Sequence, residues 1–112
     1  MTIPVEDRAM LERMERARQQ TERHIEIIED QIAARAERIT ITAHAGARQF
    51  GRGTHRWRRA DLRAFHNAIA ALHFARRTEI DALSRKLARQ AGAIAAFRAA
   101  RRFRSQAKEI AP

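Results

Sequence analysis

The most constraining feature of the sequence is a seam of positions that recur in alternating steps of three and four residues. Beginning at Leu11, the seam passes through positions 11, 14, 18, 21, 25, 28, 32, 35 and 39. A repeat of this period places one stripe of an α-helix against a partner helix and is typical of paired helices. Together with Pro4 and the acidic residues Glu6 and Asp7, which suit a helix start, the seam predicts a helix over about residues 4–39.

The same seam is a candidate surface for contact between copies of the chain. Its apolar members, which we expect to mediate oligomerisation, are Leu11, Met14, Ile25, Ile28, Ile32 and Ile39. Arg18, Thr21 and Arg35 interrupt the seam, where they weaken a pairing or fix its register. A chain of 112 residues hides only about two-thirds of its unfolded surface, so oligomerisation would help it. We therefore expect a single domain over residues 1–112 that forms an oligomeric bundle.

The helical period is lost after residue 39. Ile39-Thr40-Ile41-Thr42 alternates with period two in β-branched residues, and three of the four glycines follow, at positions 46, 51 and 53. Such a composition is typical of strands and tight turns. The sequence predicts a Gly/Arg-rich turn or short β-hairpin over about residues 40–58, with Ile39–Ala43 as one strand and part of His55–Arg58 as the other.

A second helix is predicted over about residues 61–106, with Asp61 as its N-cap. The three-four rhythm resumes at Leu62, Phe65, Ile69 and Leu72, and continues through Ile80, Leu83, Leu87, Ile94 and Phe97. Its phase slips near Arg76, and Gly92 is a place where the helix could divide. The expected fold class is mainly α, a long helical hairpin with a structured basic tip and a second helix broken near Gly92.

Charge is segregated along the chain. Residues 1–40 hold nine acidic residues and seven arginines, whereas residues 41–112 hold fourteen arginines and two lysines against four acids. Such asymmetry does not help a chain to compact, and it points to association with a polyanion. The acidic row on the first helix also predicts opposite-charge contacts with the basic second helix in an antiparallel pairing.

The charge pattern makes two segments candidate nucleic-acid contacts. Arginine forks bind phosphates bidentately, and an aromatic side chain stacks on bases or anchors the tip. The residues assigned to the tip are Arg48, Arg52, Arg56, Trp57, Arg58, Arg59 and Arg63. A second basic cluster near the end of the second helix adds Arg101, Arg102 and Arg104, part of which the helix dipole alone explains.

Other kinds of site are weakly represented. There is no cysteine, and His66 with His73 lacks a third ligand at metal-binding spacing. The acidic row Glu22, Glu26, Glu29 and Asp30 reads as a solvated or salt-bridging face, with no nucleophile and base beside it. We therefore predict no catalytic residues, no metal and no cofactor. A secretory signal, a membrane span and a membrane partner are not expected, and the expected location is the cytoplasm or a phage particle.

Residues 32–75 resemble the small head-to-tail joining proteins of tailed phages, the gpW-like group. In that family a short Gly- and Arg-rich hairpin leads into a helix that begins near an Asp, and Arg38-Ile39-Thr40-Ile41-Thr42 followed by Arg58-Arg59-Ala60-Asp61-Leu62 is similar to it. The first helix expected here is longer than the family's, and the C-terminal basic helix has no counterpart there. The resemblance implies a ring at a portal, with basic residues facing packaged DNA.

Two functions follow from these features. The first is a small non-enzymatic accessory protein that oligomerises and binds the phosphates of DNA or RNA, largely without sequence specificity. The alternative is a structural or assembly protein, either a phage head–tail joining or DNA-packaging component or a coiled-coil adaptor for an acidic protein. An oligomer that persists in high salt would distinguish the alternative from a salt-labile nucleic-acid complex.

Overall fold

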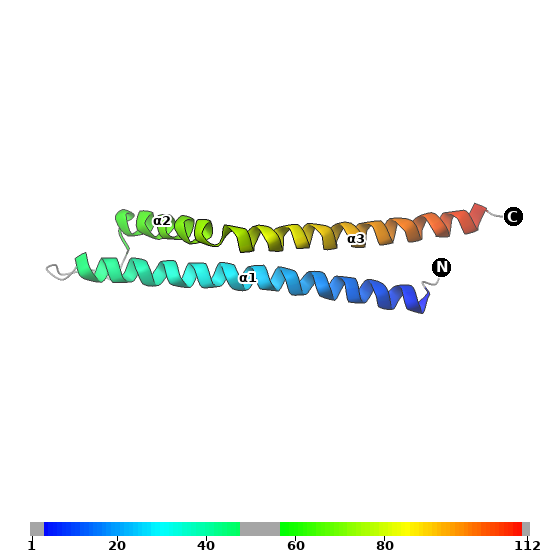
Figure 1. Ribbon diagram of the computed structural model, residues 1–112, viewed down its shortest axis with the longest axis horizontal. Helices are drawn as coiled ribbons and strands as arrows, with labels where there is room; N and C mark the ends of the chain where they lie inside the picture. Colours follow the sequence, from blue (N-terminus) through cyan, green and yellow to red (C-terminus); the bar gives the residue numbers. More distant parts are fainter. Residues whose placement is uncertain (1–3, 48–56, 111–112) are drawn as a thin grey trace. The chain divides into compact units, whose positions relative to one another are not determined.

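The computed structural model describes residues 4–47 and 57–110, and these residues form three helices (Figure 1). Helix α1 spans Val5–Ala47, α2 spans Arg59–Ala75 and α3 spans Arg77–Ile110. The prediction of a mainly α fold is confirmed, and no strand occurs in the described ranges.

The chain divides into two units, to which α1 and α3 both contribute. The first unit comprises Met1–His24 with Ala82–Pro112, and the second comprises Ile25–Asp81. In the first unit α1 runs antiparallel to α3, because Ala17 contacts Gln90 while the earlier residue Asp7 contacts Arg101. In the second unit α1 runs antiparallel to α2, as the contacts below show. The single-domain prediction stays a prediction.

The second unit holds two ion pairs that define the direction and register of its helices. Nδ1 of His44 lies 2.9 Å from Oδ2 of Asp61, and Nε2 of His73 lies 2.9 Å from Oε2 of Glu29. Lower residue numbers on α1 therefore meet higher numbers on α2. The predicted pairing of acidic residues on the first helix with cations on the second is seen in the first unit, where Glu15 pairs with Arg98 and Asp7 with Arg101. In the second unit both partners are histidines, and in one pair the acid lies on α2.

The predicted strand Ile39–Ala43 is wrong, because α1 continues through it to Ala47. The hydroxyl groups of Thr40 and Thr42 donate hydrogen bonds to the carbonyl oxygens of Ala36 and Arg38, each at 2.8 Å. These bonds satisfy the two hydroxyls inside the helix. Thr40 is 1% exposed, so burial of its position against the rest of the unit outweighs the local β propensity of the sequence.

The buried stripe of α1 follows the predicted seam at its start and leaves it near the end. Ile28 and Ile32 are 2% and 3% exposed, as the seam predicts, but the next buried positions are Ala36 and Thr40. Arg35 is exposed and Ile39 is 44% exposed, so the stripe that is buried within the chain leaves the seam at these two positions. Steps of four residues keep the cationic Arg35 out of the core, where its charge would be costly.

The proposed oligomerisation residues are largely used within the chain itself. Leu11, Met14 and Ile25 are half-buried, while Ile28 and Ile32 are buried. A contact between copies through Ile28 or Ile32 would require the chain's own packing to open. Ile39 is the member of the set that is exposed in the single chain.

Helix α2 begins two residues earlier than predicted, and Asp61 has a different role from the one assigned to it. Arg58 is the N-cap residue, and Asp61 is the third residue of the helix. Oδ2 of Asp61 accepts a hydrogen bond of 2.8 Å from the backbone N–H of Arg58. An acidic side chain at this position satisfies an N–H group that the helix leaves without a partner.

The division of the second helical segment lies at Arg76 and not at Gly92. Arg76 has φ −106° and ψ 14°, outside the helical region, and α3 begins at the next residue. The slip in the apolar pattern therefore marks the real break. The Arg76 side chain spans it, with Nη1 donating to Oε1 of Gln31 at 2.9 Å and Nη2 lying 3.0 Å from Oε2 of Glu79.

Gly92 lies in the interior of α3 and leads to the first prediction. It is exposed, its φ is not positive, and a Cβ atom built on it meets nothing within 4 Å. Glycine in an exposed helix interior costs about 0.5–1 kcal/mol relative to alanine. We expect Gly92→Ala to raise the free energy of unfolding by about that amount in urea denaturation. A destabilised variant would show that Gly92 is needed for a contact or bend.

Candidate functional site

The arginines at the start of α2 are exposed and lack ion-pair partners among the described residues. Arg58, Arg59 and Arg63 occupy the N-cap and the first five positions of the helix. The other arginines assigned to the tip, Arg48, Arg52 and Arg56, lie outside the described residues. Arg58 and Arg59 lie at the first turn, where the positive end of the helix dipole repels cations, so their placement costs stability, whereas Arg63 lies beyond that turn. The helix dipole therefore does not favour these cations.

Trp57 packs beside these arginines, directly before α2. Its ring centroid lies 5.4 Å from that of Phe65, with the ring planes tilted by 56°, and the residue is half-buried. Phe65 in turn meets His66 edge-on at 5.7 Å. Aromatic pairs at such distances stabilise packing beyond their buried area. The Trp57 ring therefore packs against α2, and its predicted part in nucleic-acid binding stays a prediction.

Asp61 ties the start of α2 to the end of α1. It accepts the N–H of Arg58 and pairs with His44, whose side chain is 15% exposed against 14% for Asp61. The hydrogen bond from Arg58, followed by that from His44, lowers the pKa of Asp61 from its ordinary value of 3.8. The charged carboxylate is thus the form that joins His44 near the end of α1 to the N-cap of α2.

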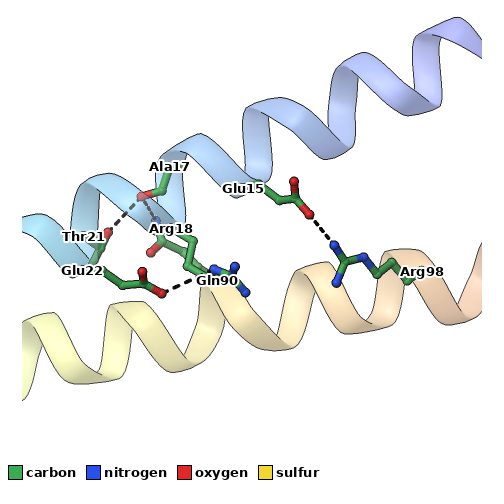
Figure 2. Close-up of polar contacts among 7 residues, drawn as sticks. All are labelled: Glu15, Ala17, Arg18, Thr21, Glu22, Gln90 and Arg98. Atoms are coloured by element: carbon green, nitrogen blue, oxygen red, sulfur yellow. Dashed lines mark hydrogen bonds and ion pairs between the residues drawn. The ribbon is translucent and has the colours of Figure 1, made fainter.

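The second basic cluster is divided between paired and unpaired side chains. Nε of Arg101 lies 3.5 Å from Oδ2 of Asp7, and the Arg101 side chain is only 14% exposed. Arg98 pairs with Glu15 across the same unit (Figure 2). Arg102 and Arg104 are exposed and have no ion-pair partner among the described residues. Arg101 therefore acts within the fold, whereas Arg102 and Arg104 remain open to a ligand.

The dipole explanation for this cluster does not hold in full. The predicted helix end at residue 106 would have placed the cluster in the last turns, but α3 continues to Ile110. Only Lys108 lies in the last turn. The dipole effect falls off within one turn, so it does not account for Arg102 and Arg104.

The interface of the first unit contains a polar layer (Figure 2). The carbonyl oxygen of Ala17 accepts hydrogen bonds from Oγ1 of Thr21 at 3.2 Å and from Nε2 of Gln90 at 3.3 Å. Arg18, in the same layer, has its Nε 3.5 Å from Oε1 of Glu22. Thr21 and Arg18, two of the three residues predicted to interrupt the seam, thus find their partners on α1 itself, and the polar contact from α3 is the Gln90 bond to Ala17.

A cavity of about 520 Å³ opens between the two helices of the first unit. Its walls are Leu11 of α1 and six side chains of α3 between Arg98 and Glu109. Two of its three arginines are neutralised by Glu15 and Asp7, and Glu109 adds a negative charge. The cavity is therefore not a strong anion site by itself.

The surplus charge of the protein lies in two places. Residues 4–24 hold five acids and five arginines, and residues 25–47 and 57–81 together hold seven of each. Residues 48–56 add three arginines, and residues 82–110 hold eight cations against Glu109 alone. The formal net charge of +10 thus comes from the segment 48–56 and from α3 after residue 81.

The sequence analysis did not include some of the cations of α3 among the candidate binding residues. Four exposed cations of α3 were not among the candidate residues, namely Arg85, Lys86, Arg89 and Lys108. A count of charges along the helix could have found them, since one acid stands against eight cations there. These four cations become important because Arg98 and Arg101 form ion pairs and so do not contribute to the unpaired positive charge.

The remaining polar candidates take part in packing. His73 pairs with Glu29 and His66 packs against Phe65, so the two histidines do not converge. In the described ranges no three His, Cys, Asp or Glu side chains gather as metal ligands would. Among the same residues, no helix combines the length and apolar character that a membrane span needs.

Comparison of the chain with protein-family models, curated proteins and solved structures gives no match. The resemblance to the phage joining proteins also loses one of its elements, because residues 38–42 belong to α1 and do not form the first strand of a hairpin.

The contacts of Asp61 with Arg58 and His44 lead to the second prediction. Because the folded protein lowers its pKa, ionised Asp61 contributes stability above pH 3.8, and that contribution disappears as the pH falls through the folded-state pKa. We expect Asp61→Asn to lower the thermal unfolding midpoint at neutral pH, with the difference from wild type shrinking in acid. Circular dichroism melts across the pH range measure it, with exposed Asp30→Asn as control. A difference independent of pH would contradict the role of the charge.

Proposed function

We propose that this protein is a small non-enzymatic nucleic-acid-binding protein that contacts phosphates with the arginines around the start of α2. The observation that carries the proposal is the exposure of Arg58, Arg59 and Arg63 without ion-pair partners among the described residues, with Arg58 and Arg59 at a helix end where cations are unfavourable. A phosphate supplies the missing anion and accepts bidentate hydrogen bonds from arginine. Such contacts carry affinity without sequence information.

The geometry at this end of the second unit supports a preorganised contact. Trp57 packs on Phe65, and the Asp61 carboxylate joins Arg58 to His44, so the arginines start from a fixed stem. Fixed cations lose less conformational freedom when they bind, which favours affinity. The three arginines of residues 48–56 then extend the same positive region. In this proposal the whole chain is one helical hairpin with the basic segment at its tip.

The third prediction tests this contact by charge removal. We expect Arg59→Gln with Arg63→Gln to weaken nucleic-acid binding and to reduce the slope of log K against log salt by about 0.9 per lost phosphate contact. The measurement is fluorescence anisotropy of labelled duplex DNA, single-stranded DNA and RNA across about 50–300 mM salt.

The matched control for that experiment is Arg35→Gln with Arg38→Gln. These arginines are also exposed in the second unit, so the variant has the same net charge. Equal losses in the two variants would show only a general charge effect and would contradict a contact at the start of α2. Absence of binding by the wild-type protein at the lowest salt would overturn the proposed function itself.

A second candidate function is structural assembly, as a phage or packaging component or as an adaptor for an acidic protein. One observation favours it: large apolar side chains of the second unit, Ile27, Ile39, Ile41 and Leu62, are 44–48% exposed. Exposed apolar surface of this kind is used in contacts between proteins. In this proposal the helices of separate copies pack into an oligomeric bundle.

The fourth prediction separates the two candidates. An assembly held by apolar contacts persists in high salt, because salt screens charges and does not weaken apolar burial. We expect sedimentation velocity at two ionic strengths to give the same oligomer if the assembly function is right, and Ile39→Ser with Ile41→Ser to dissociate it. A monomer at both ionic strengths excludes assembly of the protein with itself.

A further inference from the structure

Helix α3 in the first unit carries six exposed cations that have no ion-pair partner among the described residues, and one of them, Arg102, also lines the cavity between α3 and α1. We call this surface the α3 basic face, and its cations are Arg85, Lys86, Arg89, Arg102, Arg104 and Lys108. We propose that the α3 basic face is a second nucleic-acid contact surface, which binds the phosphates of a duplex. This inference rests on the proposed function and deepens it, because it names the surface and the form of nucleic acid.

The placement of these cations costs the helix stability. Arg85 with Arg89 and Arg104 with Lys108 are like charges at a spacing of four residues, an arrangement that destabilises a helix by a few tenths of a kcal/mol per pair. Nearby acids are already used, since Asp7 and Glu15 hold Arg101 and Arg98. The described part of the fold therefore leaves this charge uncompensated, and a polyanion is the partner that would compensate it.

The surface between the two ends of the face allows a close approach. A line of exposed positions with helical spacing runs down the side of α3 opposite buried Ile94, and it contains Arg85, Arg89, Gly92, Ala96, Ala99 and Phe103. Residues 90–97 carry no charge. Because the side chains at 92, 96 and 99 are small, a phosphate backbone can come close to the helix while cations at both ends reach it.

A duplex fits this face better than a single strand or a protein. Single-strand binding depends on a series of aromatic side chains, and this line contains only Phe103. Arg85 and Arg104 are nineteen residues apart on one continuous helix, which corresponds to about 29 Å at 1.5 Å per residue. Two groups of cations this far apart on one continuous helix, with an uncharged stretch between them, can both contact a stiff polyanion with regularly spaced charges.

The test compares two triple variants of the full-length protein. Arg85→Gln, Lys86→Gln and Arg89→Gln remove three cations from the α3 basic face. The control variant, Arg13→Gln, Arg16→Gln and Arg23→Gln, removes three exposed cations from α1 of the same unit. Both variants have equal net charge. Circular dichroism checks that each variant keeps its helicity, and the probes are labelled duplex DNA, duplex RNA and single-stranded DNA.

We expect the α3 variant to lose duplex affinity and to flatten the log–log salt slope by up to about 0.9 for each lost contact, while the control stays close to wild type. Ala96→Glu, which keeps a good helix former, should weaken duplex binding more than Gln20→Glu, which adds the same charge on α1. Wild-type binding that both triple variants reduce equally, or that prefers the single strand, would overturn the inference and leave the proposed function standing. A wild-type protein that binds none of the probes overturns both.

Discussion

The register of the antiparallel helices is the constraint on which the rest of the structure depends. Two packed helices can bury only one stripe each, and among the described residues the fully buried apolar side chains are Ile28, Ile32, Ala36 and Ile94. With so small a core, a slip of one residue would bring Arg35 into the place of Ala36 and lose much of the apolar burial. Stability therefore depends on features that allow one register only.

Polar contacts supply those features in both units. In the first unit Thr21 and Gln90 share the carbonyl oxygen of Ala17, and a different register would take the half-buried Gln90 amide away from this partner. In the second unit the His44–Asp61 and His73–Glu29 pairs have the same effect at two levels. Buried or half-buried polar groups often contribute specificity more than net stability, and the best-attested case is the choice of register between helices.

The sequence predicts the helices well where periodicity extends over many residues, and less well where local propensity competes with packing. The sequence predicts the seam from Leu11 to Ile32 and the phase slip near Arg76, because the spacing of apolar residues indicates which side of a helix packs against its partner. The segment Ile39–Thr42 led to the wrong prediction of a strand. Its alternation of β-branched residues is a local signal, and the burial of Thr40 in the helix outweighs it. Gly92 led to the wrong prediction of a helix break for a related reason. One glycine lowers the stability of the helix by less than the neighbouring alanines raise it.

The candidate site could be predicted only in part, because charge along a sequence does not tell which side chains a fold neutralises. Arg101 and Arg102 are adjacent in the sequence, yet the first pairs with Asp7 and the second is exposed. The described residues before position 82 hold equal numbers of acids and arginines, which limits the repulsion that a chain of net charge +10 must overcome to fold. The surplus positive charge belongs to residues 48–56 and to α3 after residue 81. Charge concentrated in two stretches of the chain is an arrangement suited to a polyanion.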